Sequence, residues 1–245
     1  MEEFMNVNEI VRIVPTLKVN NRKLNERFYI ETLGMKPLLE ESAFLSLGDQ
    51  TATERLILEE APSMRTRRVE GLKKLARLLI KVENPSEIES LLSQMKFLPR
   101  LFKGNRGYAF EIVSPEEDVI LVHAENDVRD LVPLETVPEF YSNTSIKYLS
   151  QFEVSMELRL PEGTESLLDP EGVAPVITFT KGQGPDLAVE NNVTWDLTML
   201  KFLVKNFDLT SLRQKFEKTG YFVPKSEKFF LGKDTNNIEL WFEEA

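Results

Sequence analysis

The residues that could carry chemistry are limited first by two counts, one histidine and no cysteine. Without cysteine there is no thiol nucleophile, disulfide, iron–sulfur cluster or thiolate zinc site. A single imidazole cannot supply the two histidines of the His-Glu-x-x-His metalloprotease motif. Serine–histidine–aspartate catalysis would need His123, which lies in the apolar run 120–124. A structural histidine held by a hydrogen bond is favoured there over a catalytic base.

Other catalytic patterns are absent or incomplete. No Gly-x-Ser-x-Gly segment is present to expose a nucleophilic serine. Asp234-Thr235-Asn236 lacks the glycine and the second copy of an aspartic protease site, and it is typical of a turn. Gly182-Gln183-Gly184-Pro185 is a lone Gly-x-Gly, and its proline does not open a long helix, so no phosphate loop is predicted. A serine–lysine pair stays open, because such residues are plentiful and would pair only in space.

Composition indicates an acidic globular protein. Forty acidic against thirty basic residues give a formal charge of −10, and 42% of the residues are hydrophobic, enough for real cores. This charge argues against a general polyanion binder, so no nucleic acid partner is expected. The exception is the cluster Arg65-Thr66-Arg67-Arg68, followed by Lys73 and Lys74. A solvated loop is favoured there over a phosphate-binding patch.

Two features bear on location. Residues 1–8 are acidic and polar, unlike the basic start and apolar core of a secretory signal. No run of about 18 apolar residues is present, so neither a membrane span nor a membrane partner is expected. The default expectation is a cytoplasmic protein, which would act extracellularly only after release by a non-classical route. The sequence does not indicate an oligomeric state.

A repeated unit must position whatever chemistry the chain has. Three times a β-like run ends in Val-x-Asn and a helical pattern begins, at Val19-Asn20-Asn21, Val82-Glu83-Asn84 and Val204-Lys205-Asn206. Asparagine is a favoured N-cap because its side-chain oxygen accepts from the free N–H groups of the first helical turn. The recurrence therefore predicts a module in which a strand leads into a capped helix.

The modules predict a strand–helix–three-strand order, βαβββ. The first has a strand at 11–19, a helix that ends near Gly34, and strands on either side of a turn at 48–50. The second has a strand at 75–82, a helix at 85–95, and strands at 100–103, 108–113 and 119–124. The last has a strand at 195–204, a helix at 208–219 and a closing strand, and residues 232–245 align with 48–61 without a gap.

A degenerate module is predicted between the second and the last. Hydrophobic and polar residues alternate strictly over 152–160, which is typical of a half-buried strand. Gly163, Pro170 and Gly172 make any helix after it short. The predicted division is a first domain at 1–128, a linker at 129–150 marked by Pro133 and Pro138, and a second domain at 151–245. Each domain would hold two modules.

Paired βαβββ modules resemble the vicinal-oxygen-chelate, or glyoxalase-like, superfamily. Residues 14–35 resemble its opening strand and helix, with Phe28-Tyr29 and Leu33-Gly34-Met35 as the landmarks. Residues 233–240 resemble its Asp-Pro-Asp-Gly-Asn-x-x-Glu-Leu turn and closing strand. The resemblance implies an α+β fold of the glyoxalase / bleomycin-resistance / dioxygenase-like class, with curved mixed sheets in two domains.

Over its whole length the chain is also similar to the CppA family. The segments that carry the likeness are 74–78, 107–112, 195–200 and 224–234. The family name implies a virulence-associated proteinase of Gram-positive cocci that degrades the third component of host complement.

Glyoxalase-like enzymes bind a divalent metal inside the cup of the curved sheet, through a His or Glu on the first strand and a Glu on the last. The resemblance places first-strand ligands at Val14, Arg77 and about Met199, and closing-strand ligands at Arg55, Leu121 and Glu239. Only Glu239 is a ligand type, and one carboxylate does not make a site. No metal or other cofactor is therefore expected.

Three functions remain as hypotheses. The family name implies proteolysis of complement, without a recognisable catalytic motif. The retained modules, with their ligands replaced, instead favour a metal-free module that binds a small ligand or a peptide in the cup. The cup positions most suited to contact it are Arg77, Trp195 and Glu239, although packing is favoured for both Trp195 and Trp241 and a rim role for Glu239. A scaffold protein that meets a basic partner is supported only by the charge of −10.

Overall fold

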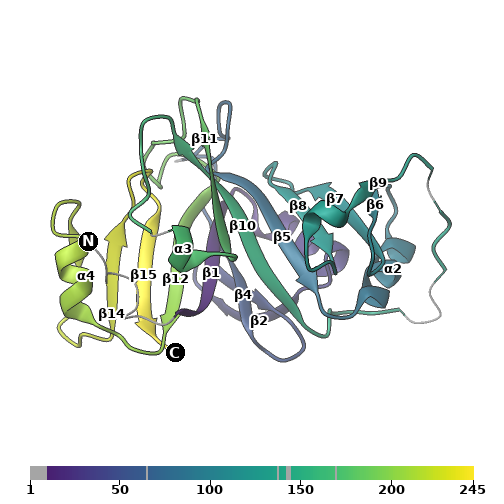
Figure 1. Ribbon diagram of the computed structural model, residues 1–245, viewed down its shortest axis with the longest axis horizontal. Coiled ribbons are helices and arrows are strands. Elements are labelled where there is room, and N and C mark those ends of the chain that lie inside the picture. Colours follow the sequence, from purple (N-terminus) through teal and green to yellow (C-terminus); the bar gives the residue numbers. More distant parts are fainter. Residues whose placement is uncertain (1–9, 65, 137, 142–144, 169) are drawn as a thin grey trace. The chain divides into compact units, whose positions relative to one another are not determined.

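The computed structural model describes residues 10–64, 66–136, 138–141, 145–168 and 170–245 (Figure 1). The acidic segment 1–8 and Arg65 of the basic cluster lie outside the described residues. The protein has short helices and two mixed β-sheets, so the predicted α+β class is confirmed. In the described residues no helix has the length and apolar character needed to cross a membrane.

The chain divides into two compact units that interleave along the sequence. Unit 1 contains residues up to Asn20, Ala61–Ala76 and Glu157–Ala245, and unit 2 contains Asn21–Glu60 and Arg77–Met156. Two strands, β5 (Leu75–Val82) and β10 (Phe152–Pro161), have residues in both units.

In unit 1 the strands follow the order β13-β14-β15-β12-β1, and β14, β15, β12 and β1 can be followed side by side in Figure 1. Their bounds are β1 Ile10–Val19, β12 Leu197–Val204, β13 Tyr221–Phe222, β14 Phe229–Lys233 and β15 Glu239–Glu244. β1 of the first module pairs antiparallel with β12 of the last, and β12 pairs parallel with β15. The remainder of unit 1 includes α3 (Pro170–Val173), β11 (Ile177–Gly182) and α4 (Leu209–Lys215).

The packed face of this sheet forms the core of unit 1. In β12, β14 and β15 buried residues alternate with half-buried ones, as expected when one face of a sheet is covered. Phe202 stacks on Phe242 with ring centroids 4.7 Å apart, and Phe216, next to α4, lies 5.3 Å from Phe230. A Cβ on Gly232 would lie 2.6 Å from the Phe216 ring, so glycine is what allows this close approach.

In unit 2 the first module continues through α1 (Arg22–Arg27) and a π-helical turn, η1 (Phe28–Thr32), that carries the Phe28-Tyr29 landmark. Three antiparallel strands follow, β2 (Lys36–Glu41), β3 (Phe44–Gly48) and β4 (Glu54–Glu60). The second module adds the order β5-β8-β7-β6-β9. Its bounds are α2 Pro85–Gln94, β6 Arg100–Lys103, β7 Tyr108–Val113, β8 Val119–His123, η2 Val128–Asp130 and β9 Val132–Pro133.

The strand pairing joins modules that are distant in the chain. β1 pairs with β12, and β5 of the second module lies beside β10 of the degenerate one. The predicted division into two domains of two modules each does not anticipate these pairings between distant modules. The boundaries 1–128, 129–150 and 151–245 stay a prediction. Within the predicted linker, β9 pairs with β6 through Val132 and Pro133, while residues 137 and 142–144 lie outside the described part.

The predicted caps are confirmed for two helices and wrong for the third. The Asn21 side chain accepts from Leu24 N at 3.0 Å, and the Asn84 side chain accepts from Ser86 N at 3.2 Å. The last helix begins two residues later than Val-x-Asn predicts, because Asp208 caps it by accepting from Thr210 N and Ser211 N. An aspartate carboxylate is as good a cap as asparagine, so the competing residue is the one used.

Candidate functional site

The second face of the unit 1 sheet, here called the open face, carries three rows of side chains. Each row is a set of cross-strand partners on β1, β12, β15 and β14, which must point to one side of the sheet. The rows are Thr16–Met199–Glu239–Lys233, Val14–Lys201–Trp241–Leu231 and Arg12–Leu203–Glu243–Phe229. On β12, β14 and β15 every member of these rows is half-buried, whereas on β1 Thr16 and Val14 are buried.

An aromatic stack occupies the open face. The rings of Phe229 and Trp241 lie 3.8 Å apart and 14° from parallel, and Phe222 on β13 lies 6.0 Å from Phe229. The Trp241 indole N–H donates to Glu243 Oε2 at 2.8 Å, and Glu243 Oε1 pairs with Lys201 Nζ at 3.0 Å. Glu243 therefore fixes the indole orientation, and the stack presents a preformed apolar surface with one ion pair beside it.

The far end of the open face is tied to residues 186–193. Lys18 Nζ donates to Asn191 O at 2.9 Å and Lys74 Nζ donates to Val189 O at 2.8 Å. Lys233 Nζ, at the end of β14, pairs with Glu190 at 2.5 Å. This 186–193 segment is therefore held by three lysines from different parts of unit 1. It lies at the same end of the sheet as the Thr16–Met199–Glu239–Lys233 row.

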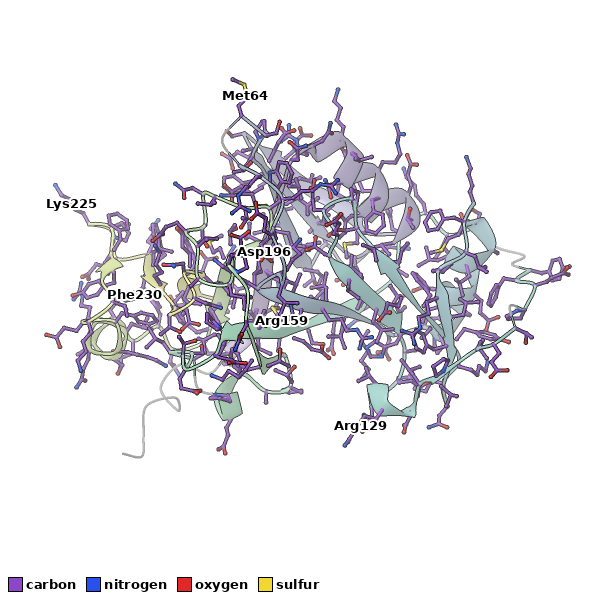
Figure 2. All side chains as sticks on the ribbon, turned by 90° about the horizontal axis from the view of Figure 1, so that it is seen from above. Met64, Arg129, Arg159, Asp196, Lys225 and Phe230 are labelled. Atoms are coloured by element: carbon purple, nitrogen blue, oxygen red, sulfur yellow. The ribbon has the colours of Figure 1, made fainter. Side chains whose placement is uncertain are left out.

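Lys74 is a buried amine in this cluster. Burial lowers the pKa of Lys74 to about 8, and the positive charge of Lys233 contributes to this lowering. The negative charges of Asp196 and Glu190 act in the opposite direction and raise the pKa. Its Nζ donates to Val189 O and, at 3.5 Å, to Asn191 Oδ1. In the described part of the chain no serine hydroxyl is a hydrogen-bond partner of Lys74 Nζ, so these contacts do not form a serine–lysine pair. Asp196, labelled in Figure 2, is buried and accepts from Lys74 N at 2.6 Å.

The metal-ligand positions in unit 1 do not fit a divalent cation. Val14 is completely buried opposite Lys201, and Met199 lies between Thr16 and Glu239. Glu239 is the only carboxylate among them, and the ammonium group of Lys233 lies on the neighbouring strand position. A thioether, an aliphatic side chain and one carboxylate near ammonium groups do not make a hard-cation site. Among the described residues no group of three or more His, Cys, Asp or Glu side chains could hold a metal ion.

The positions in unit 2 hold arginine and leucine in structural contacts. Arg77 forms an ion pair with Glu111, which also accepts from Arg100 at 3.4 Å. Leu121, opposite Glu111, belongs to an apolar cluster with Leu79, Phe102 and Ala109 that Val128 and Leu131 cover. Arg55 forms an ion pair of 3.0 Å with the fully buried Asp49. These guanidinium and aliphatic groups do not fit a metal either.

His123 is buried in unit 2 with 4% of its surface exposed. Burial lowers its pKa to about 4, and the positive charges of Lys81 and Arg77 lower it further, although a backbone hydrogen bond with Glu125 opposes this. The imidazole is thus neutral at pH 7, and among the described residues its Nδ1 has no hydrogen-bond partner.

The Trp195 side chain is buried in unit 1 and forms hydrogen bonds there. It is 6% exposed, and its indole N–H donates to Ala61 O at 2.8 Å and to Thr66 Oγ1 at 2.7 Å. Arg67 of the basic cluster binds Asp186 through both terminal nitrogens, at 2.6 and 2.8 Å. Part of the cluster therefore connects loops instead of forming a free basic patch. Arg77, Trp195 and Glu239 as ligand contacts stay a prediction.

The sequence reading missed the open-face stack. From the sequence, core or cup-lining packing is favoured for Trp241 over a ligand-stacking platform, and nothing singles out Phe229, Lys201 or Glu243. The signal was the alternation Phe229-Leu231-Lys233 against Glu239-Trp241-Glu243, but reading it as one surface requires the register of β14 on β15.

Comparisons with known proteins agree with this fold. The family described as CppA N-terminal matches residues 12–134, and the family described as CppA C-terminal matches residues 149–242. The crystal structure of the cppA protein from Streptococcus pneumoniae TIGR4 is 66% identical, with a TM-score of 0.94 over 98% of this chain and 100% of that one.

A more distant likeness shows the fold alone. The crystal structure of glyoxalase I from Zea mays matches with a TM-score of 0.55 and 9% identity, over 97% of this chain and 92% of that one. The glyoxalase-like fold predicted from the βαβββ modules is thereby confirmed. Comparison with curated proteins gives no match.

Proposed function

The chain belongs to the CppA family, and from this premise we propose that it is a metal-independent binding protein with a glyoxalase-like fold. Its ligand, a small molecule or a peptide, lies on the open face of unit 1 and contacts the stacked rings of Phe229 and Trp241. No catalytic step is assigned to this face.

The observation that carries the proposal is the preformed aromatic stack. Two aromatic rings 3.8 Å apart are half-buried on a sheet face, and the Trp241 indole is already held by Glu243. A rigid aromatic surface gives a ligand contact area without a large entropic cost of ordering. The Lys201–Glu243 ion pair offers both signs of charge at its border.

The charges that border the former metal positions also support binding without a cation. Lys201 lies opposite Val14 and beside Trp241, and Lys233 lies opposite Glu239. Ammonium groups at these places, paired with Glu243 and Glu190, disfavour a divalent cation beside Glu239.

A thermal-shift screen of organic acids, aromatic amines, sugars and short peptides, run in EDTA, tests the proposal. A binder at about 100 times its dissociation constant stabilises the fold by about 2.7 kcal/mol, which raises the melting temperature measurably. Trp241→Ala removes the platform, so it is expected to abolish the shift. Leu39→Ala in unit 2 is the matched control, because Leu39 is an exposed apolar side chain of another sheet region.

Proteolysis of the third component of complement is the second candidate, and the family resemblance is what favours it. His123 and Lys74 are two titratable groups with altered pKa values that such an activity could recruit, and both are buried. The test is incubation of complement protein with purified protein at far below equimolar amounts. Cleavage that scales with time and survives removal of host proteases supports this candidate, and an intact complement chain contradicts it.

A further inference from the structure

The aromatic stack continues to an edge of the unit 1 sheet. β13 is the edge strand of this sheet, and in the strand order its one neighbour is β14. In that pairing Tyr221 lies opposite Gly232 and Phe222 lies opposite Leu231. Phe222 is 56% exposed and shares the open face with Phe229 and Trp241. An edge strand offers main-chain donors and acceptors to an added strand, whose alternate side chains fall on one face.

The surroundings of this edge are basic, unlike the chain as a whole. Residues 213–228 contain five basic and two acidic side chains, a net charge of +3 in a chain of −10. Arg213 pairs with Glu227 at 2.7 Å and connects α4 to the β13–β14 loop. Lys218, Lys225 and Lys228 are exposed, and in the described structure none of them forms an ion pair. Figure 2 shows Lys225 extending outward from the loop between β13 and β14.

We propose that the partner of the open face is an acidic peptide in extended conformation that adds to β13. Its acidic side chains meet Lys218, Lys225 and Lys228, and an aromatic or aliphatic side chain lies over Phe222, Phe229 and Trp241. Main-chain pairing supplies affinity, the apolar anchor fixes the register, and the lysines select an acidic sequence. This inference rests on the proposed function and names the class of its ligand.

The probe is a dye-labelled peptide of about nine residues, the length of a strand, in which phenylalanine and glutamate alternate. Fluorescence anisotropy measures its binding to the full chain. A second peptide carries lysine in place of glutamate, and a third carries proline at alternate positions to remove strand-forming N–H groups. The acidic peptide is expected to bind, and the other two to bind at least about tenfold more weakly.

Two sets of variants locate the contact. Lys225→Glu with Lys228→Glu should weaken binding of the acidic peptide by about tenfold at low salt, with a smaller loss at high salt. Lys23→Glu with Lys96→Glu makes the same change of net charge at exposed sites of unit 2 and should leave binding unchanged. Phe222→Ala should weaken binding by about tenfold or more, and because this ring is largely exposed, the variant is expected to fold.

The outcomes separate this inference from the proposed function. If the lysine-containing peptide binds as well, or if the unit 2 variants weaken binding as much, the acidic class is wrong while a ligand on the stack remains. If a single-stranded oligonucleotide displaces the acidic peptide and binds more tightly, the partner class is wrong, since basic and aromatic side chains also suit nucleic acid. If Phe222→Ala and Trp241→Ala leave every binder unaffected, the proposed function fails as well.

Discussion

At the scale of single residues, burial shifts the pKa values of several ionisable side chains, and His123 and Lys74 are the two basic ones among them. His123 and Lys74 both lose access to water, which disfavours their charged forms and lowers their pKa values. Such shifts often mark catalytic groups, but here both side chains are almost completely buried, and the Lys74 amine donates to Val189 O and Asn191 Oδ1. The side chains that a ligand can reach are instead the exposed Phe222, the half-buried Trp241 and the exposed lysines around β13.

The single histidine gives a direct measurement. The pKa of His123 is about 4 in the folded protein and 6.5 in an unfolded chain. The folded protein therefore takes up this proton at a lower pH than the unfolded chain does. Its ring proton resonances should therefore hold their positions as pH falls from 7 to 5. The free energy of unfolding should decrease as pH falls from 6.5 toward 4. A ring titration centred near 6.5 would contradict the burial of this imidazole.

Lys74 makes the free energy of unfolding depend on pH in the alkaline range. Its pKa is about 8 in the folded protein and 10.5 when unfolded, so between these values the unfolded chain holds the extra proton. Stability due to this group should therefore rise with pH from about 8 to 10.5, and Lys74→Met should remove that rise.

Urea denaturation of wild type and Lys74→Met across that range measures the difference in slope. Lys225→Met is the matched control, because Lys225 is exposed. Parallel curves for wild type and Lys74→Met would mean that the Lys74 amine is not desolvated.

At the scale of elements, the repeated Val-x-Asn and alternation patterns predict where strands and helices lie better than they predict helix caps and helix type. The strands at 75–82, 100–103 and 108–113 have the bounds that the sequence indicates, because alternation and turn residues mark both ends. The third cap shifts to Asp208, because two good capping residues stand two positions apart and the sequence pattern alone does not choose between them. The Phe28-Tyr29 segment is π-helical, and no helical periodicity rule signals that.

The cap assignment can be tested by a pair of substitutions. Asp208→Ala removes a side chain that accepts from Thr210 N and Ser211 N, and it should lower the free energy of unfolding by about 1 kcal/mol. Asn206→Ala should change it little, because Asp208 and not Asn206 caps α4. Equal losses in chemical denaturation, or the larger loss at Asn206, would restore the Val-x-Asn interpretation for this helix.

At the scale of the whole molecule, family membership and glyoxalase-like fold follow from sequence, while the candidate site does not. The βαβββ order and the landmark segments are local patterns, so a sequence displays them. The open face is assembled from β13, β14, β15, β12 and β1, and β1 is joined to β12 across most of the chain. A surface made by register between distant strands cannot be read before that register is known.

The fold does not depend on the side chains at the positions where glyoxalase-like enzymes hold a metal. The strands that carry ligands in glyoxalase-like enzymes are present, yet they bear Val14, Met199, Arg77 and Leu121. A scaffold keeps its strand order through backbone pairing and core packing, which do not depend on the side chains of the cup. The site can therefore change its ligand class while the sheet stays intact.

The measurement that tests the account most directly is the position of the two indole N–H resonances during ligand titration. Trp195 and Trp241 are the only tryptophans, and Trp241→Phe assigns the two signals. Binders from the thermal-shift screen are added in EDTA and again with zinc, nickel or manganese. We predict that they move the Trp241 signal, leave the Trp195 signal in place, and act equally well without metal. Binding that requires a metal ion, or that leaves the Trp241 signal unmoved, would contradict the account.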